Sequence, residues 1–296
     1  MIMKVFHYST KLLFIIFLLA ITLFAPKMGN ARMAIPENNL SYPVLISLDD
    51  GSSASGFYMR NNKNELFLVT AGHVLFKRED DNFTLKSKKA ILLSQPFPLV
   101  PEEQIEIELD LGILINNKSV VSNFPRDVIV VKIANYIKKE EKEFAKFIRG
   151  VLPKDSLKQK QIVVAETEGI KKYDKVLVSN EIFIFGYPTS LGIKNDPQID
   201  YKKPLLRKGI VAGKNDKQKT IILDCPVYQG NSGGPCVEVE QEGLQSKYLI
   251  IGVVLQFIPF EEKWLNLNYN RVNTDWENSG YSVVEPIDTV LDLIEK

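Results

Sequence analysis

One loop of the chain combines a serine with three glycines and lies between two strand-like runs. The loop is Gly230–Pro235, with Ser232 near its centre, and the runs are Thr220–Leu223 before it and Cys236–Val239 after it. Glycine lets the backbone turn tightly and point successive N–H groups to one side. An exposed nucleophile beside an oxyanion pocket needs both properties. Ser232 is therefore a candidate nucleophile.

A serine hydroxyl is a weak nucleophile at neutral pH unless a base takes its proton, so Ser232 needs a histidine. The chain has two histidines, His7 and His73, and His7 lies in a segment that we expect to be removed. A lone histidine is more often a surface or core residue than a catalytic one. His73, however, stands at the end of a strand-like run, and the small residues Ala71 and Gly72 leave room for a partner. His73 is the candidate base.

A catalytic histidine also needs a carboxylate that holds the imidazole in the correct tautomer and stabilises its charged form. Asp127 heads Val128–Ile133, a run apolar enough for a buried strand. A carboxylate in that place needs a partner to offset its desolvation, and His73 could supply one. Asp110, which heads Leu111–Ile115, is the alternative, and a strand-start aspartate facing water is the simplest interpretation of either. We favour Asp127.

The order of these residues and the motifs around them resemble those of the trypsin-like (chymotrypsin-fold) serine proteases. The motifs are Thr70–Val74 around the histidine, an aspartate followed by a buried apolar strand, and Gly230–Pro235 around the serine. The resemblance is greatest to the bacterial exported branch that includes the Deg-type and glutamyl endopeptidases. It extends from about Tyr42 to about Ile287, with weaker similarity at Ser55–Phe57, Gly186–Pro188 and Gly209–Val211.

The resemblance implies an all-β fold of two antiparallel six-stranded β-barrels with a C-terminal helix. We expect a signal peptide at 1–31, the first barrel at 32–134, a charged, helical connection at 135–180, and the second barrel with the helix at 181–296. The residues themselves agree with an all-β protein, because short apolar runs such as Gly112–Ile115 alternate with turn residues.

Two segments of the chain favour helix. Asn135–Gly150 is rich in charged, helix-favouring residues and breaks the strand pattern, whereas Pro286–Glu295 has apolar residues at helical spacing. Because only the short helix follows Pro286, we expect no appended peptide-binding domain.

By the same resemblance, His73 and Asp127 come from the first barrel and Ser232 from the second. Ser232 would attack the scissile carbonyl, His73 would act as general base and then general acid, and Asp127 would orient His73. The backbone N–H groups of Gly230 and Ser232 would bind the developing oxyanion. The implied function is a serine endopeptidase acting on polypeptides. A catalytically idle peptide-binding module on the same fold and an esterase are the alternatives.

The resemblance also indicates where a substrate binds. The strand that includes Leu255, Gln256 and Phe257 resembles the edge that accepts the substrate as an added strand. The base of the specificity pocket is expected near Pro226 and Val227, with Ser282 and Phe257 on its walls. None of these residues is charged, so we expect a small or apolar side chain at the cleaved position rather than Lys or Arg.

Asn231 precedes the serine at a position where the digestive branch of the family has an aspartate paired with a newly cut N-terminus. A neutral residue needs no ammonium partner. We therefore expect activity without zymogen cleavage of that kind, although Asn231 could also be a residue merely tolerated in a turn.

The N-terminus has the three parts of a secretory signal. Lys4 and Lys11 precede the apolar run Leu12–Ala25, and a small-residue cleavage site ends at Ala31. An uncleaved membrane anchor is the alternative, but the run is shorter than the roughly 20 apolar residues that span a bilayer. We expect a cleaved signal, no stable membrane insertion, and an exported protein that is periplasmic or secreted.

Composition narrows the range of partners. The 296 residues carry a formal net charge of +1, without the basic excess typical of nucleic-acid binding. The two cysteines, Cys225 and Cys236, flank the serine loop; an exported protein permits a disulfide, but the sequence leaves the pairing open. With one histidine in the expected mature chain, we predict no metal site and no cofactor. The oligomeric state is not predicted.

Overall fold

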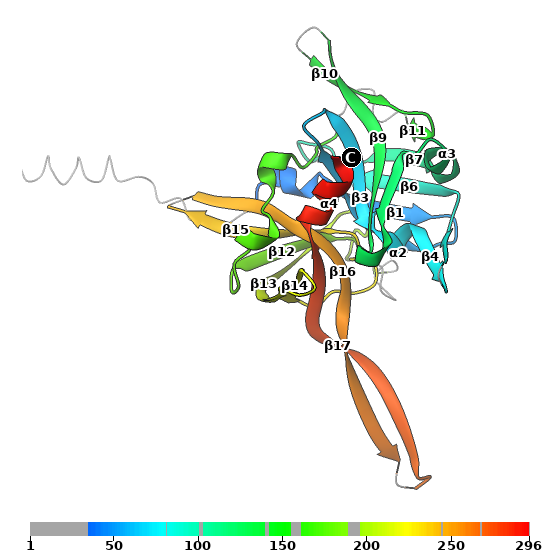
Figure 1. Cartoon of the computed structure of the whole chain (residues 1–296), viewed down its shortest axis with the longest axis vertical. Coiled ribbons are helices and arrows are strands. Elements are labelled where there is room, and N and C mark those ends of the chain that lie inside the picture. The colour runs from blue at the N-terminus through cyan, green and yellow to red at the C-terminus, as the bar shows by residue number, and fades with distance from the viewer. Residues whose placement is uncertain are drawn as a thin grey trace, which may run out of the picture. The chain divides into compact units, whose positions relative to one another are not determined.

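The computed structural model describes residues 35–80, 82–100, 103–139, 142–154, 161–188, 196–243, 245–266 and 268–295 (Figure 1). The expected signal peptide at 1–31 lies outside these residues. Among the helices that are described, none is long and apolar enough to cross a membrane. Pro36–Lys296 form one compact unit built from two β-sheet halves.

The first half of the unit is an antiparallel sheet in which nine strands are described, in the order β10-β9-β3-β2-β1-β6-β7-β11, with β8 paired to β9. The strands are β1 (Pro43–Leu48), β2 (Ser53–Arg60), β3 (Glu65–Ala71), β6 (Lys89–Ser94), β7 (Ile105–Asp110), β8 (Val120–Asn123), β9 (Val128–Lys139), β10 (Lys142–Phe147) and β11 (Val151–Pro153). In β7 the side chains of Ile105, Ile107 and Leu109 are buried and those between them are half-buried. A period of two puts alternate side chains on one face, so the sheet closes over one apolar core.

Two small elements follow β3 at the edge of this core. The short helix α2 (Gly72–Leu75) continues directly from β3, and the hairpin of β4 (Phe76–Glu79) and β5 (Asn82–Leu85) comes next.

The second half is a closed barrel of six strands, in the order β12-β13-β14-β17-β16-β15. The strands are β12 (Glu181–Gly186), β13 (Leu205–Asn215), β14 (Thr220–Asp224), β15 (Pro235–Glu242), β16 (Gln245–Asn266) and β17 (Arg271–Pro286). The predicted all-β, two-barrel class is therefore confirmed. The two halves differ in closure, because only the second forms a complete hydrogen-bonded ring in the described residues.

The predicted C-terminal helix is confirmed as α4 (Ile287–Ile294), which buries its apolar stripe, including Ile287, Val290 and Ile294. It contacts β8 and β9 of the first sheet as well as β16 and β17 of the barrel. At its end, Asn61 Nδ2 donates a hydrogen bond of 3.0 Å to the Ile294 carbonyl oxygen. The helix therefore joins the two halves, and their relative position is held by packing.

The prediction of a helical connection beginning at Asn135 is wrong. The segment continues β9 and turns back as β10, with Ile137 opposite Phe144 and Tyr136 opposite Ala145. Helix propensity is a weak preference, and here strand pairing overrides it because β9 enters this segment from the buried centre of the sheet. Described charged residues of this segment, such as Lys138 and Glu143, lie on the projecting β9–β10 hairpin instead (Figure 1).

The strand predicted at Gly112–Ile115 is also wrong, because these residues lie in α3 (Leu111–Asn116). Asp110 caps this helix, and its Oδ1 accepts a 2.9 Å hydrogen bond from the Ile113 N–H. Leu111 and Leu114 are the buried residues, three apart, as one face of a helix requires. A short apolar run does not distinguish strand from helix without its cap.

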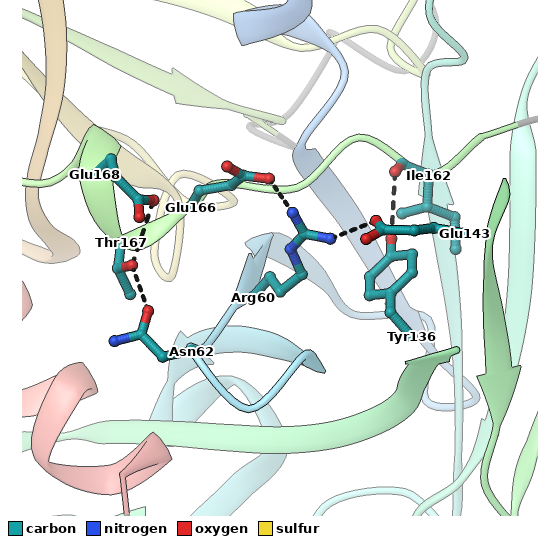
Figure 2. A network of polar contacts seen from close by, with 8 residues as sticks. All are labelled: Arg60, Asn62, Tyr136, Glu143, Ile162, Glu166, Thr167 and Glu168. Atoms are coloured by element: carbon teal, nitrogen blue, oxygen red, sulfur yellow. Dashed lines mark hydrogen bonds and ion pairs between the residues drawn. The ribbon is translucent and has the colours of Figure 1, made fainter. Parts of the chain in front are cut away.

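A polar network holds the segment between the two halves against the first sheet (Figure 2). The Arg60 guanidinium lies between Glu143, at 2.8 Å, and Glu166, and it stacks on the Tyr136 ring at 5.2 Å. The Tyr136 hydroxyl in turn donates to the Ile162 carbonyl oxygen at 3.4 Å. These contacts hold Ile162 and Glu166 against the first sheet.

Candidate active site

His73 and Asp127 are brought into direct contact by neighbouring strands. The Nδ1 of His73 lies 2.6 Å from Oδ2 of Asp127, and the backbone N–H of His73 donates to Oδ1 of the same carboxylate at 2.8 Å. Both carboxylate oxygens therefore bind one residue, which fixes the imidazole orientation. Asp110, the alternative carboxylate, is used as the cap of α3.

The local backbone explains this contact. β3 pairs with β9 as far as Ala71 opposite Val128, so the residues just beyond each strand meet. Asp127 has a φ of 55°, a left-handed conformation that costs a non-glycine residue free energy. Its carbonyl oxygen accepts a 2.8 Å hydrogen bond from the Gly72 N–H. A Cβ on Gly72 would lie 2.8 Å from Asp127 Oδ1, so a larger residue there would displace the carboxylate.

Arg126 ties the aspartate to the second barrel. It ends the 3-10 turn η2 (Phe124–Arg126) immediately before Asp127. Its Nε donates to Oε1 of Glu285 in β17 at 2.7 Å, and its other nitrogens donate to the carbonyl oxygens of Gln218 and Lys219. The Glu285 side chain is 2% exposed, so this is an ion pair with one deeply buried partner. Through Arg126, the position of Asp127 depends on the second barrel.

The serine loop is held from the first sheet by Ser55 of β2. The Ser55 N–H donates to the Ser232 carbonyl oxygen at 3.0 Å, and the Ser55 hydroxyl donates to the Gly230 carbonyl oxygen at 2.6 Å. Gly233 has a φ of +85°, and a Cβ there would lie 2.2 Å from the Ser55 carbonyl oxygen. The glycine is therefore needed both for the turn and for this close approach.

Asn231 is buried within the same loop. Its Oδ1 accepts a 3.1 Å hydrogen bond from the Tyr228 N–H, and its own N–H donates to the Tyr228 carbonyl oxygen at 3.0 Å. Its Nδ2 has no hydrogen-bond partner among the described residues. The side chain thus shapes the turn before Ser232 by local bonds.

The Ser232 hydroxyl does not bond His73 in this structure. It donates instead to the Leu255 carbonyl oxygen of β16 at 2.8 Å. The N–H groups of Gly230, which has a φ of +94°, and of Ser232 form no backbone hydrogen bond within the described part of the chain. The three predicted catalytic residues line one cavity, but among them only His73 and Asp127 are hydrogen-bonded to each other.

Two cavities meet at His73 and Ser232. The larger, of about 630 Å³, is lined by His73, Phe76, Arg78, Phe83, Phe124, Pro125, Asp127, Val227, Tyr228, Gln229, Ser232, Leu255, Gln256 and Phe257. The smaller, of about 460 Å³, is lined by Leu48, Gly51, Ser52, Ser53, Ala54, His73, Val74, Lys86, Gln229, Gly230 and Ser232. Ser232 thus lines both cavities.

Four of the six predicted substrate-binding residues line the larger cavity. Val227 and the strand residues Leu255, Gln256 and Phe257 line it, whereas Pro226 and Ser282 line neither cavity. Ser282 is instead buried in β17, and its hydroxyl has no hydrogen-bond partner among the described residues.

Sequence reasoning missed an aromatic wall of the larger cavity. Phe83 of the β4–β5 hairpin stacks on Phe124 at a ring distance of 3.8 Å, and Phe76 packs edge-on against Phe124 at 5.4 Å. Arg78, from the same hairpin, adds a positive charge. No motif marks these residues, because the stack forms between segments far apart in the chain.

The two cysteines are free thiols, and both are buried. Burial raises the pKa of Cys225 to about 11 and that of Cys236 well above its usual value, so neither is a thiolate near neutral pH. In the described residues, no group of three or more His, Cys, Asp or Glu side chains could hold a metal ion.

Comparison with known proteins identifies the family. Residues 54–244 match the model of the Trypsin-like peptidase domain. No curated protein matches the chain.

Among solved structures, the HtrA-type protease AlgW with tripeptide matches with a TM-score of 0.48, 14% identity, 91% of this chain and 63% of that chain. The thermostable serine protease AL20 from an extremophilic microorganism matches with a TM-score of 0.45, 11% identity, 84% of this chain and 92% of that chain. An AlgW variant with decapeptide matches with a TM-score of 0.44, 12% identity, 86% of this chain and 62% of that chain. The chain thus spans less than two thirds of the AlgW chains.

The matched residues, 54–244, make up more than half of the chain and include His73, Asp127 and Ser232. The chain therefore belongs to the trypsin-like peptidase domain family.

Proposed function

We propose that Ser232, His73 and Asp127 are the catalytic triad of an exported endopeptidase. The observation that supports this most is the double contact of Asp127 with His73, at 2.6 and 2.8 Å, beside the cavities that Ser232 also lines. A carboxylate held in this way keeps Nδ1 protonated and leaves Nε2 free to accept a proton.

In the first step, the Ser232 hydroxyl turns from the Leu255 carbonyl oxygen to Nε2 of His73. As Ser232 Oγ bonds to the scissile carbonyl carbon, its proton passes to His73, and the carbonyl oxygen becomes an oxyanion. The N–H groups of Gly230 and Ser232 donate to that oxyanion, and removing one such donor typically costs about 3 kcal/mol in the barrier.

In the second step, the C–N bond breaks and His73 returns its proton to the leaving amine. Water then enters, gives a proton to His73, and its oxygen bonds to the acyl carbon. The Ser232 oxygen leaves with the proton, which releases the acid product. Asp127 stays ionised and stabilises the imidazolium in both steps.

Substrate itself can release the nucleophile. A chain added to the edge of β16 presents N–H groups, and one of them can bond the Leu255 carbonyl oxygen in place of the Ser232 hydroxyl. Attack would then be coupled to binding.

For the cleaved position, we propose a small or apolar side chain. Val227 and Phe257 line the cavity next to Ser232, and neither carries a charge. The buried Asn231 makes its hydrogen bonds to Tyr228 within its own loop, which supports activity without an ammonium partner. Export by the N-terminal signal, to the periplasm or outside the cell, belongs to the same proposal.

A catalytically idle peptide-binding module is the second candidate, and the bond from Ser232 to Leu255 favours it. A fluorophosphonate probe separates the two, because it labels only an activated serine. We expect the wild type to be labelled, and Ser232→Ala and His73→Ala not to be labelled. A folded wild type that takes no label, yet binds peptides, would identify the binding module.

The same preparation tests specificity. Incubation with a mixed peptide library, with cleaved bonds identified by mass spectrometry, is expected to show cuts after small or apolar residues. Cuts clustered after Lys or Arg would contradict the proposed pocket. Comparison of peptide and ester turnover addresses the esterase alternative.

A further inference from the structure

β16 and β17 continue beyond the barrel as a two-stranded ribbon, which we call the arm. It comprises residues 259–266 of β16 and 271–278 of β17, with pairing from Pro259 opposite Asn278 to Asn266 opposite Arg271, and the turn residues 268–270 at its tip (Figure 1). Figure 1 shows the ribbon in orange and brown, leaving the barrel where β16 and β17 separate from the other strands. A two-stranded hairpin with no third strand is only marginally stable in water.

The arm exposes large apolar side chains that have no core to enter. Trp264 is 56% exposed, Trp276 is 64% exposed and Tyr269 is 76% exposed. These two tryptophans are the only ones in the chain. Phe260, Leu265 and Val272 are also exposed. Exposed apolar groups gathered on one element usually mark a surface that another molecule covers.

The apolar groups lie on both faces of the ribbon. Side chains alternate along a strand, so Phe260 and Trp264 share one face, and Leu265 lies on the other. Val272 is directly opposite Leu265, and Trp276, four residues further along β17, lies on that same second face. A flat surface would cover only one face, whereas a chain that runs along the edge of a ribbon can reach side chains on both.

One edge of β16 is open from the nucleophile to the tip of the arm. β15 pairs with β16 up to Val253, and the serine loop then bonds Val254 through Gly233 and Gly234. From Gln256 to Asn266, β17 is the strand that pairs with β16 among the described residues, and the register shifts at Leu255 and at Ile258. The first carbonyl oxygen of this open edge, that of Leu255, is the acceptor of the Ser232 hydroxyl.

The edge sets both the direction and the reach of a bound chain. Antiparallel pairing is the more stable arrangement, and an added antiparallel strand runs from Asn266 towards Leu255. Residues along the arm are then on the amino side of the bond at Ser232. At about 3.3 Å per residue, the edge extends roughly 35 Å from Leu255. Pro259 lacks an N–H and removes one backbone donor near the base of the arm.

The charged residues of the arm indicate which kind of polypeptide it binds. The arm carries Glu261, Glu262, Asp275 and Glu277 against Lys263 and Arg271. Glu261 is paired with Lys263 at 3.0 Å. The remaining acidic excess favours basic residues in the occupant and disfavours an anionic lipid surface.

We propose that the arm binds the amino-side portion of an extended polypeptide substrate, roughly ten residues long, with apolar and basic side chains. This inference rests on the proposed function, because it extends the substrate edge of the same site. The enzyme would then cleave unfolded chains or long loops faster than short peptides with the same cleaved bond. β-strand addition supplies the affinity, and the aromatic side chains on both faces supply the preference.

The two tryptophans allow a direct test of binding without cleavage. Ser232→Ala protein is titrated with a 14-residue peptide that has ten residues on the amino side of a cleavable bond, and with a six-residue peptide centred on the same bond. We expect the emission of Trp264 and Trp276 to shift to shorter wavelength with the long peptide only. Trp264→Phe and Trp276→Phe, each with one tryptophan left, locate the change.

Other occupants give different outcomes in the same assay. An emission shift on raising the protein concentration without peptide indicates a second copy of the chain. A shift caused only by vesicles of zwitterionic lipid indicates a membrane surface. Either result, or no shift with the long peptide, overturns the proposal.

Catalysis provides the second readout. For Trp264→Ser/Trp276→Ser, we expect the ratio of kcat/KM for the long peptide to kcat/KM for the short peptide to fall about tenfold. Phe144→Ser is the matched control, since Phe144 is 50% exposed on the other projecting hairpin, and it should leave the ratio unchanged. An unchanged ratio in the arm variant contradicts the arm proposal. Failure of the wild type to cleave either peptide contradicts the proposed function instead, and the fluorescence titration still tests the arm.

Discussion

The two halves of the site differ in how far they are prepared for catalysis. In the first sheet, His73 and Asp127 are already joined by two hydrogen bonds of 2.6 and 2.8 Å. In the barrel, the Ser232 hydroxyl is bonded at 2.8 Å to Leu255, away from His73. The proposed base, His73, is thus positioned by strand pairing, whereas the proposed nucleophile, Ser232, needs a rotation that a bound substrate can favour.

This difference identifies what each half requires. His73 is oriented by the single carboxylate of Asp127, so a change of that carboxylate should lower the rate of catalysis far more than the stability of the protein. The loop around Ser232 is shaped by buried polar groups, so changes of those groups should lower both the rate of catalysis and the stability.

Asp127→Asn breaks the prepared half and should have the largest effect. The amide would present its N–H₂ or a single acceptor to His73 and favour the wrong tautomer. We expect kcat/KM to fall by about 10⁴-fold, as is usual when this carboxylate is neutralised, with the protein still folded. Peptide hydrolysis and thermal unfolding measure the two quantities.

Asp110→Asn is the matched control, because Asp110 caps α3 and lies outside both cavities. It should retain activity. A comparable loss of rate in both variants would show that Asp127 has no special role.

Asn231→Asp places a charge in the buried part of the serine half. An uncompensated buried charge costs about 3 kcal/mol, so we expect the free energy of unfolding to fall by that amount. Chemical denaturation measures it. Asn62→Asp, on an exposed residue, is the control and should change little. Unaltered stability of Asn231→Asp would mean that a cation reaches the loop.

Ser55→Ala removes the link by which the first sheet holds the serine loop. The Gly230 carbonyl oxygen would lose its 2.6 Å bond and the Tyr187 N–H its 2.8 Å bond to the Ser55 hydroxyl. We expect a loss of about 2 kcal/mol in stability and a fall in kcat larger than the change in KM.

Ser53→Ala, two residues away in β2, is the control for stability, because the Ser53 hydroxyl is buried without a hydrogen-bond partner in the described residues. Equal destabilisation of the two variants would argue against the role of the Ser55 bonds.

Glu285→Gln tests the ion pair between Arg126 and Glu285, which links the first sheet to the barrel. It should have the smallest effect of these substitutions. Burial raises the pKa of Glu285 above its ordinary 4.5, and the bonds from Thr289 and Arg126 only partly oppose this. Between 4.5 and the raised pKa, the folded state holds a proton that the unfolded state has lost, so the free energy of unfolding falls as pH rises. In the variant this fall should be smaller. Denaturation at a series of pH values from 4.5 upward measures it, and identical slopes would contradict the assignment.

The sequence predicted well where local chemistry and tertiary structure agree. Most of the short apolar runs became strands, and the spacing of Ile287, Val290 and Ile294 correctly predicted α4. Prediction from the sequence was wrong where strand pairing or a helix cap determines the local structure. The charged residues after Asn135 favour helix, but β9 carries its pairing into them, and the cap from Asp110 turned an expected strand into α3.

At the candidate site, the sequence indicated which residues could take part in the chemistry, but not which residues surround them in space. Val227, Leu255, Gln256 and Phe257 line the larger cavity, whereas Pro226 and Ser282 line neither cavity, and the substrate-binding role of all six stays a prediction. The ring stack of Phe83 on Phe124 and the ion pair of Arg126 with Glu285 join segments far apart in the chain. Such contacts leave no periodic pattern in a sequence.

By itself, the sequence determined which groups are available for acyl transfer: a serine among glycines, one histidine outside residues 1–31, and an aspartate before an apolar strand. Only the tertiary structure decided that Asp127 rather than Asp110 meets His73, that Ser232 is bonded to Leu255, and that β16 extends into an arm. The physical reason is that reactivity belongs to residue types, whereas distance and register depend on how strands pair across the whole chain.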